Sequence, residues 1–233
     1  MANQFNRTEL LLGKENMEKL SKTHILIFGV GGVGGYVVEA LARSGIYHFT
    51  IVDNDTISET NINRQIIATE ETLGQPKVEV MKKRILSINP RAKVNAKQMF
   101  FTHENAEEID FNQFDCIVDA IDTIKSKLEI IQIADRLHKP IISSMGAGNK
   151  VNPMGFVVTD INKTDTDPLA KIIRFQLRKL GIKKLKVVYS KEQPIKVQEQ
   201  EDGKFVPGSN AFVPSAAGLL IASEVVKDLI KDE

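Results

Sequence analysis

Residues 25–35 read Ile-Leu-Ile-Phe-Gly-Val-Gly-Gly-Val-Gly-Gly, and this stretch decides the fold. An apolar run ends in glycines, and the apolar pattern of a helix begins at Tyr36, which predicts a strand, a tight turn and a helix. Gly29, Gly31 and Gly34 have the G-x-G-x-x-G spacing, which permits the turn, admits a phosphate close to the backbone and lets the helix pack on the strand. The free N–H groups that begin such a helix attract an anion. We therefore expect a nucleotide at this turn.

An acid at the end of the second strand supports this interpretation. The apolar run of residues 48–52 ends at Asp53, where a carboxylate can hold a ribose hydroxyl. The additional glycine, Gly32, has no side chain, so phosphates could approach the backbone closely there. The alternative is a purely structural glycine turn. The glycines alone do not decide between a redox cofactor and phosphate chemistry.

The rest of the chain predicts an α/β fold with a Rossmann-like, doubly wound and mainly parallel sheet. Segments that predict strands alternate with segments that predict helices, and such alternation gives parallel strands with right-handed crossovers. The expected strands after Asp53 are 94–99, 115–120 and 140–145, and the expected helices are 76–88 and 124–137. After residue 148 the alternation breaks, and strands at 155–159 and 185–189 with helices at 168–180 and 214–230 predict an extension of the same sheet.

We expect one nucleotide-binding domain over residues 1–233, since the length suits a single large core. Within it we expect an N-terminal helical arm (1–23), a nucleotide-binding core (24–148) and a C-terminal extension (149–233). Residues 191–210 are polar and rich in turn-forming residues. No internal repeat is visible.

Composition limits the class of protein. The apolar content of 42% and the charged content of 26% are ordinary for a globular domain, and the net charge of +1 predicts no global attraction to nucleic acid or membrane. The one cysteine, Cys116, excludes an internal disulfide and a cysteine-based zinc site, and its apolar strand predicts a core position. We find no stretch of transmembrane length and no signal-peptide core, so we expect a cytoplasmic protein.

The long connection after Asp53 favours phosphate chemistry. It holds a set of polar residues, and loops of this length inside a compact α/β unit are usually functional. An Arg fork and a Lys point charge this close to the ribose acid suit a triphosphate, whereas a nicotinamide cofactor has no need of them. The bland alternatives are solvated loop residues and a surface ion pair. The polar residues concerned are Asp55, Asn61, Asn63, Arg64, Gln65 and Lys77.

Asp122 follows the predicted strand 115–120, at the carboxyl edge of the sheet where ligands of doubly wound folds lie. A carboxylate there could hold Mg²⁺ that bridges phosphate oxygens. The alternative is a helix N-cap.

Together these motifs resemble the ubiquitin-activating-type adenylyltransferases, the superfamily that includes ThiF. The resemblance covers most of residues 5–148 and rests on the glycine turn 29–34, Asp53-x-Asp55, the stretch 61–65, residues 75–77, residues 88–90 and the stretch 119–122. It implies binding of ATP and Mg²⁺ and attack of a carboxylate on the α-phosphate, which gives an acyl adenylate and pyrophosphate.

The resemblance also implies residue roles. Asp53 would hold the ribose, Asn61, Arg64 and Lys77 would hold the phosphates, and Asp122 would hold the magnesium. Arg7 matches an N-terminal arginine of the family that reaches the ATP of a partner subunit, which implies a homodimer.

The rest of the chain resembles one branch of the family, the tRNA threonylcarbamoyladenosine dehydratases. The likeness lies in residues 7–9, 144–148, 163–170 and 208–214. It implies adenylation of the threonyl carboxylate on a modified adenosine beside the anticodon, followed by closure of the carbamoyl group onto it and release of AMP. No protein nucleophile is needed, which agrees with the absence of zinc-binding Cys-x-x-Cys pairs and of a catalytic cysteine on a downstream loop. Whether a sulfur-relay protein also docks stays open.

A tRNA substrate needs a basic surface, and residues 171–186 contain seven Lys or Arg and no acid. Such a patch can hold RNA phosphates through charge and counterion release, although the alternative is an ordinary solvated helix face. We expect Lys171, Arg174 and Arg178 to share one helix face, next to Lys183, Lys184 and Lys186.

Three other functions remain open at this point. One is adenylation of the C-terminus of a small sulfur-carrier protein, which zinc or thioester cysteines would favour. Another is a nicotinamide-dependent oxidoreductase that uses the same glycine turn. The third is an ATP-binding scaffold without catalytic activity.

Overall fold

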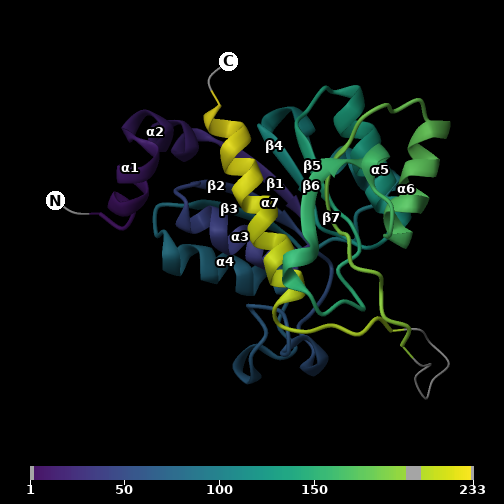
Figure 1. The fold of residues 1–233 in the computed structure, drawn as a ribbon. Coiled ribbons are helices and arrows are strands. Elements are labelled where there is room, and N and C mark those ends of the chain that lie inside the picture. The colour runs from purple at the N-terminus through teal and green to yellow at the C-terminus, as the bar shows by residue number, and fades with distance from the viewer. Residues whose placement is uncertain (1–2, 198–205, 232–233) are drawn as a thin grey trace.

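The structure is a computed structural model that describes residues 3–197 and 206–231. Strands and helices alternate along most of it (Figure 1). The strands are β1 (His24–Phe28), β2 (His48–Val52), β3 (Lys93–Lys97), β4 (Cys116–Asp119), β5 (Ile141–Ser144), β6 (Phe156–Asp160) and β7 (Lys186–Ser190). The helices are α1 (Asn6–Leu12), α2 (Lys14–Lys22), α3 (Gly34–Arg43), α4 (Lys77–Ile88), α5 (Ile124–Arg136), α6 (Pro168–Lys179) and α7 (Val213–Ile230).

The strands of the described residues form one sheet of seven, in the order β3-β2-β1-β4-β5-β7-β6. Neighbouring strands are parallel except β6, which runs antiparallel to β7. The chain moves outward from β1 first in one direction and then in the other, so the strand order reverses between β1 and β4, where ligands of such sheets bind. The predicted fold class is confirmed, including the C-terminal extension of the sheet by β6 and β7.

The side chains of β1 alternate between two cores. Ile25 and Ile27 pack with residues of α3, α4 and α7, whereas Leu26 and Phe28 pack with residues of α5 on the other face. All four are at most 1% exposed. Because both faces are covered, the strand reads in the sequence as an unbroken apolar run, as buried parallel strands do.

The last helix supports the glycine turn. In Figure 1, α7 runs alongside α3, the helix that follows the turn. Gly218 permits this close approach, because a Cβ on it would lie 2.4 Å from the carbonyl oxygen of Val33. The C-terminal extension therefore braces the element that the sequence marks as the nucleotide site.

The predicted boundaries need small corrections. Pro76 is the N-cap of α4 and not its first helical residue, and β3 begins one residue earlier and ends two residues earlier than expected. In the N-terminal arm, Leu10 and Leu11 are 88% and 82% exposed, so they do not pack on the core of their own chain. Part of the turn-rich segment 191–210, namely 198–205, lies outside the described residues. None of the helices described is long and apolar enough to cross a membrane.

Candidate active site

A cavity of about 650 Å³ opens at the carboxyl edge of the sheet, a size typical of small-molecule sites. It draws together segments from most of the chain, because the carboxyl ends of parallel strands meet at one edge. The predicted residues that line it are Gly29, Gly31, Gly32, Asp53, Asp55, Asn61, Arg64, Gln65, Lys77 and Asp122. Gly34 and Arg7 are not among its lining residues.

Packing explains the glycines of the turn. Gly29 has φ +85°, and a Cβ on it would lie 2.8 Å from the carbonyl oxygen of Ala120. A Cβ on Gly34 would lie 1.8 Å from the carbonyl oxygen of Gly29. Gly34 therefore lets the helix approach the strand closely, although it does not line the cavity itself. Gly32 has a further reason beyond room for a ligand, since a Cβ there would lie 3.2 Å from Cβ of Pro214.

Asp53 ties the end of β2 to the glycine turn. Its Oδ2 accepts a hydrogen bond of 2.8 Å from the N–H of Val30, and its Oδ1 accepts one of 2.9 Å from the N–H of Asp55. Burial raises the pKa of Asp53 above its ordinary value, against the opposing effect of these two N–H groups. The carboxylate therefore orders the turn as well as facing the cavity.

Lys77 and Asp55 form an ion pair in the cavity wall. The Lys77 Nζ lies 2.7 Å from Asp55 Oδ2, and the lysine side chain is 6% exposed while that of the aspartate is 55% exposed. The alternative of a surface ion pair is wrong for Lys77, since its ammonium is buried. A buried cation with one solvated partner can exchange that partner for another anion, such as a phosphate.

Arg64 reaches the cavity with its charge unpaired. Its Nη1 donates to the carbonyl oxygen of Thr60 at 2.6 Å and to Oδ1 of Asn63 at 2.8 Å. Among the residues described, no carboxylate lies within 4.0 Å of it. Neutral partners hold the guanidinium in place, and its positive charge stays available to an anion.

Asn61 and Gln65 line the cavity as buried amides. Asn61 Oδ1 accepts a hydrogen bond of 3.2 Å from the N–H of Ser58. The Oε1 of Gln65 is buried without any hydrogen-bond partner in the described part of the chain. Buried polar atoms are normally hydrogen-bonded, so an orphan at a cavity indicates that a ligand completes the site. A polar nucleotide fits this requirement.

Asp122 is exposed at the cavity and makes no hydrogen bond to any described residue. The alternative of a helix N-cap is wrong, because the N-cap of α5 is Thr123 and no side chain caps it. A free carboxylate in the same cavity as Arg64 and Lys77 fits Mg²⁺ that also takes phosphate oxygens and water as ligands. The described residues contain no group of three His, Cys, Asp or Glu that could hold a metal by themselves.

Arg7 lies far from the cavity of its own chain. It is exposed on α1, and the arm contacts the opposite edge of the sheet, where the ring of Phe5 lies 6.0 Å from that of Tyr47 just before β2. The predicted contact of Arg7 with ATP therefore requires a second subunit.

The predicted basic surface is smaller than expected. Arg174 donates to the carbonyl oxygen of Thr164 at 2.8 Å and also to its hydroxyl, and Lys186 pairs with Glu224 at 3.0 Å and Asp228 at 2.6 Å. Two carboxylates already hold Lys186, whereas the partners of Arg174 are neutral oxygens, so among the described residues its charge has no carboxylate partner. The exposed members are Lys171, Arg178, Lys183 and Lys184.

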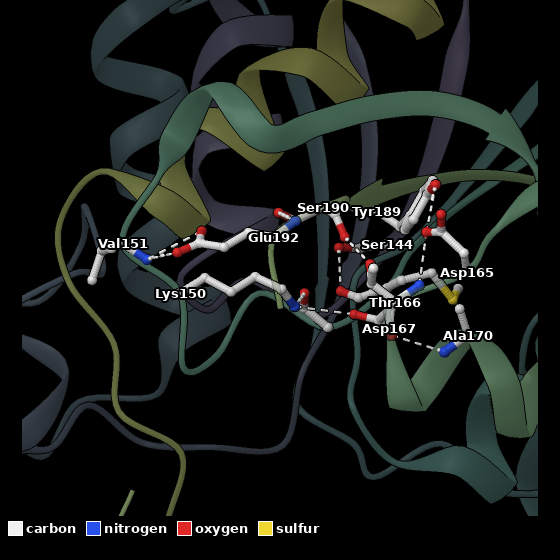
Figure 2. A network of polar contacts seen from close by, with 12 residues as sticks. Ser144, Lys150, Val151, Asp165, Thr166, Asp167, Ala170, Tyr189, Ser190 and Glu192 are labelled. Atoms are coloured by element: carbon white, nitrogen blue, oxygen red, sulfur yellow. Dashed lines mark hydrogen bonds and ion pairs between the residues drawn. The ribbon is translucent and has the colours of Figure 1, made fainter. Parts of the chain in front are cut away.

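Sequence reasoning missed two buried ion pairs beside the cavity. Lys127 Nζ lies 2.7 Å from Asp119 Oδ2, and neither side chain is exposed. Lys150 Nζ lies 3.1 Å from Asp167 Oδ2, and both residues line the cavity (Figure 2). A signal was available for Lys127, which shares a helix face with buried Ile130 and Ile131; a lysine on an apolar face indicates a buried partner.

Known proteins are similar to this chain along most of its length. The model of the ThiF family matches residues 3–233. A tRNA threonylcarbamoyladenosine dehydratase of Bacillus subtilis (strain 168) is 46% identical over 245 aligned positions, which cover 100% of this chain and 96% of that protein.

Solved structures give the same likeness. The crystal structure of E. coli tRNA N6-threonylcarbamoyladenosine dehydratase in complex with AMP has a TM-score of 0.91 and 32% identity, covering 97% of this chain and 94% of that one. The complex of the E. coli enzyme with ATP has a TM-score of 0.90 and 32% identity, covering 97% of this chain and 93% of that one.

Proposed function

Because this chain belongs to the ThiF family, we propose that it is an ATP-dependent tRNA threonylcarbamoyladenosine dehydratase. The observation that carries the proposal is the 46% identity with the Bacillus subtilis enzyme along essentially the full length of both chains. The cavity independently supports the ATP part of this proposal, since its cations, its orphaned amide and its free carboxylate suit a nucleoside triphosphate.

The reaction has two steps. In the first, an oxygen of the threonyl carboxylate attacks the α-phosphorus of ATP, and pyrophosphate leaves with the electron pair of the broken P–O bond. In the second, the carbamoyl group attacks the acyl carbon and loses a proton, and AMP leaves with the former carboxylate oxygen. The nucleoside loses the elements of one water, and ATP becomes AMP and pyrophosphate.

The cavity residues take roles that follow from their surroundings. Asp53 holds the ribose at the end of β2 while keeping the turn in place. Arg64 and Lys77 neutralise the phosphates, with Lys77 exchanging Asp55 for a phosphate oxygen, and the buried amides of Asn61 and Gln65 complete the polar contacts.

Asp122 would hold Mg²⁺, whose charge, when it is bound, offsets that of the phosphates. This assignment uses the one acid at the cavity that is exposed and unbonded among the described residues. Asp53 and Asp55, by contrast, already accept hydrogen bonds or an ion pair from the protein.

The proposed reaction needs no thiol nucleophile, and the one thiol of this chain is buried. Cys116 is its one cysteine, and burial raises the pKa of that thiol to about 12. A thiol with such a pKa stays protonated near neutral pH and is a poor nucleophile. This observation disfavours adenylation of a carrier protein that continues through a thioester on the enzyme.

We further propose a cytoplasmic homodimer in which Arg7 of one subunit reaches the ATP of the other. Leu10 and Leu11 lie on the same short helix as Arg7 and are largely exposed, as expected of a surface that a second copy covers. The four exposed cations Lys171, Arg178, Lys183 and Lys184 would contact tRNA phosphates.

One assay tests the proposed function. The protein is incubated with Mg²⁺ and ATP and with tRNA that either carries or lacks threonylcarbamoyladenosine. AMP formation and the loss of one water from the nucleoside are followed, the latter by mass spectrometry. We expect AMP formation and the loss of water only with the modified tRNA. Equal rates of ATP turnover with modified and unmodified tRNA would contradict the proposal.

A further inference from the structure

The cavity extends past the glycine turn to the loop after β5, where Gly146, Ala147 and Gly148 line it. β5 lies two strands away from β1 in the sheet, so this loop lies beside the nucleotide-binding residues. The proposed function places the triphosphate at the glycine turn and leaves the reacting acyl group without a binding element. The inference below rests on that proposed function and supplies such an element.

The backbone of this loop has N–H groups without hydrogen-bond acceptors among the described residues. Within the ranges that the structure describes, the N–H groups of Gly146, Ala147 and Gly148 make no hydrogen bond, although all three residues are partly buried. The N–H groups on either side, those of Met145 and Asn149, each donate 2.8 Å bonds to backbone carbonyls. In a turn conformation, successive backbone N–H groups form a concavity that binds an anion.

A buried lysine sets the direction of one of these donors. Lys150 Nζ donates to the carbonyl oxygen of Gly146 at 2.6 Å, and the lysine side chain is 1% exposed within the wall. The peptide bond between Gly146 and Ala147 is trans, so its N–H points opposite to its carbonyl. The Ala147 N–H therefore points away from Lys150, and Ala147 itself lines the cavity. A cation on the carbonyl also polarises the peptide, which makes its N–H a stronger donor.

Asp167 holds Lys150 in this position. Its Oδ2 lies 3.1 Å from Lys150 Nζ, and its Oδ1 accepts a 2.8 Å bond from the N–H of Ala170 in the first turn of α6 (Figure 2). Gly146 leaves room for this carboxylate, because a Cβ there would lie 2.7 Å from Oδ2. A buried ion pair adds little stability by itself. This one holds the Lys150 ammonium against the carbonyl oxygen of Gly146.

We propose that the peptide joining Gly146 and Ala147 binds the acyl group of the substrate and that Lys150, held by Asp167, is its positioning residue. The Ala147 N–H donates to the carbonyl oxygen of the threonyl acyl group. When the carbamoyl group attacks the acyl carbon, an electron pair moves onto that oxygen, and it returns as AMP leaves. The hydrogen bond strengthens as the charge develops, as in an oxyanion hole.

A charge-neutral double variant tests the role of the pair. Lys150→Met with Asp167→Asn removes both charges, leaves no buried ion unpaired and keeps an acceptor for the Ala170 N–H. The probes are a sulfamate of adenosine that carries an N-carbamoylthreonyl group and the same sulfamate without it, titrated by calorimetry. We expect the wild type to bind the acylated sulfamate more tightly than the bare one. In the double variant this ratio of Kd values, the acyl gain, should be about tenfold smaller. Its kcat should fall about 100-fold with the KM for ATP unchanged.

Two further variants keep the test decisive. Arg84→Met breaks an ion pair with Glu39 that joins α4 to α3 outside the cavity, and it should keep the full acyl gain. Lys150→Arg keeps a donor for both acceptors and should retain most of the gain. Equal loss in Lys150→Arg and the double variant would indicate collapse of the wall and overturn the positioning role.

The remaining outcomes are also distinct. A wild type that binds the acylated and bare sulfamates equally well, or a double variant that keeps the full gain, would overturn the inference. Failure of the proposed function has another signature, since the wild type would then leave the modified nucleoside in tRNA unchanged in the presence of ATP.

Discussion

The carboxylate of Asp53 accepts a 2.8 Å hydrogen bond from the N–H of Val30, so the end of β2 holds the glycine turn directly. Replacing Asp53 by Asn removes the charge and turns one acceptor into a donor that faces an N–H group. We expect the free energy of unfolding to fall by about 1–3 kcal/mol and the Kd for ATP to rise at least tenfold. Urea unfolding and calorimetry measure the two effects.

The control for Asp53 lies at the opposite edge of the sheet. Asp115 accepts a 2.8 Å hydrogen bond from the N–H of His24, which begins β1. Asp115→Asn should therefore cost comparable stability while leaving the affinity for ATP unchanged. Loss of ATP affinity in both variants would show that stability alone explains the effect.

Asp122→Ala should abolish activity without weakening the fold. Its carboxylate is exposed and makes no hydrogen bond or ion pair with a described residue, and such substitutions change stability by at most about 0.5 kcal/mol. AMP formation with modified tRNA should fall at least 100-fold because the magnesium ligand is lost. Asp135→Ala, at the exposed far end of α5, is the control. A fully active Asp122→Ala would remove the magnesium assignment.

Arg7 acts in the partner's site if the proposed dimer is correct. Arg7→Ala and Asp122→Ala should each be inactive, whereas dimers re-formed from a mixture should regain activity. In such a mixed dimer one site has Asp122 from the first variant and Arg7 from the second. Activity of the mixture is measured by AMP formation after unfolding and refolding together. Restoration in trans is excluded if the mixture stays as inactive as its components.

Lys171→Glu with Arg178→Glu should weaken tRNA binding without affecting ATP binding. The two side chains are exposed on α6, and loss of two phosphate contacts should reduce the dependence of log Kd on log salt by about two. Lys22→Glu with Lys83→Glu makes the same change in net charge on other surfaces and is the control. If both pairs weaken binding equally, α6 has no special role.

His24 should make stability depend on pH. Burial, followed by the nearby His48, lowers the pKa of His24 below its ordinary value of 6.5, while Asp115 opposes the shift. Between the folded pKa and 6.5 the unfolded chain binds more protons, so the free energy of unfolding should fall as pH falls below 6.5. Urea unfolding across this range should give a flatter curve for His24→Gln. Identical curves would show that other groups cause the dependence.

Local patterns predicted much of the fold and many of the residues that line the cavity. The glycine turn, Asp53 and the polar stretch around Arg64 lie close to one another along the chain, and spacing alone encodes their geometry. The mainly parallel sheet followed from the alternation of strands and helices.

Contacts between distant segments could not be predicted in this way. A helix pattern placed Arg174 on a polar face correctly, but not beside the carbonyl of Thr164, which belongs to the loop before α6. The acidic partners of Lys186 could not be predicted, because Glu224 and Asp228 lie on α7, far from Lys186 in the sequence. The ion pair of Lys150 with Asp167 could not be predicted either, because it forms only where the loop after β5 packs against the start of α6.

The buried Lys127 bears on how a ligand enters this protein. Its ammonium joins Asp119 at the end of β4 with the hydroxyl of Ser143 and the carbonyl of Ser144 at the end of β5, directly below two loops of the cavity. These hydrogen bonds hold the ends of β4 and β5 together without a contribution from a ligand. Binding then loses little conformational entropy at these strands, and more of the contact energy appears as affinity.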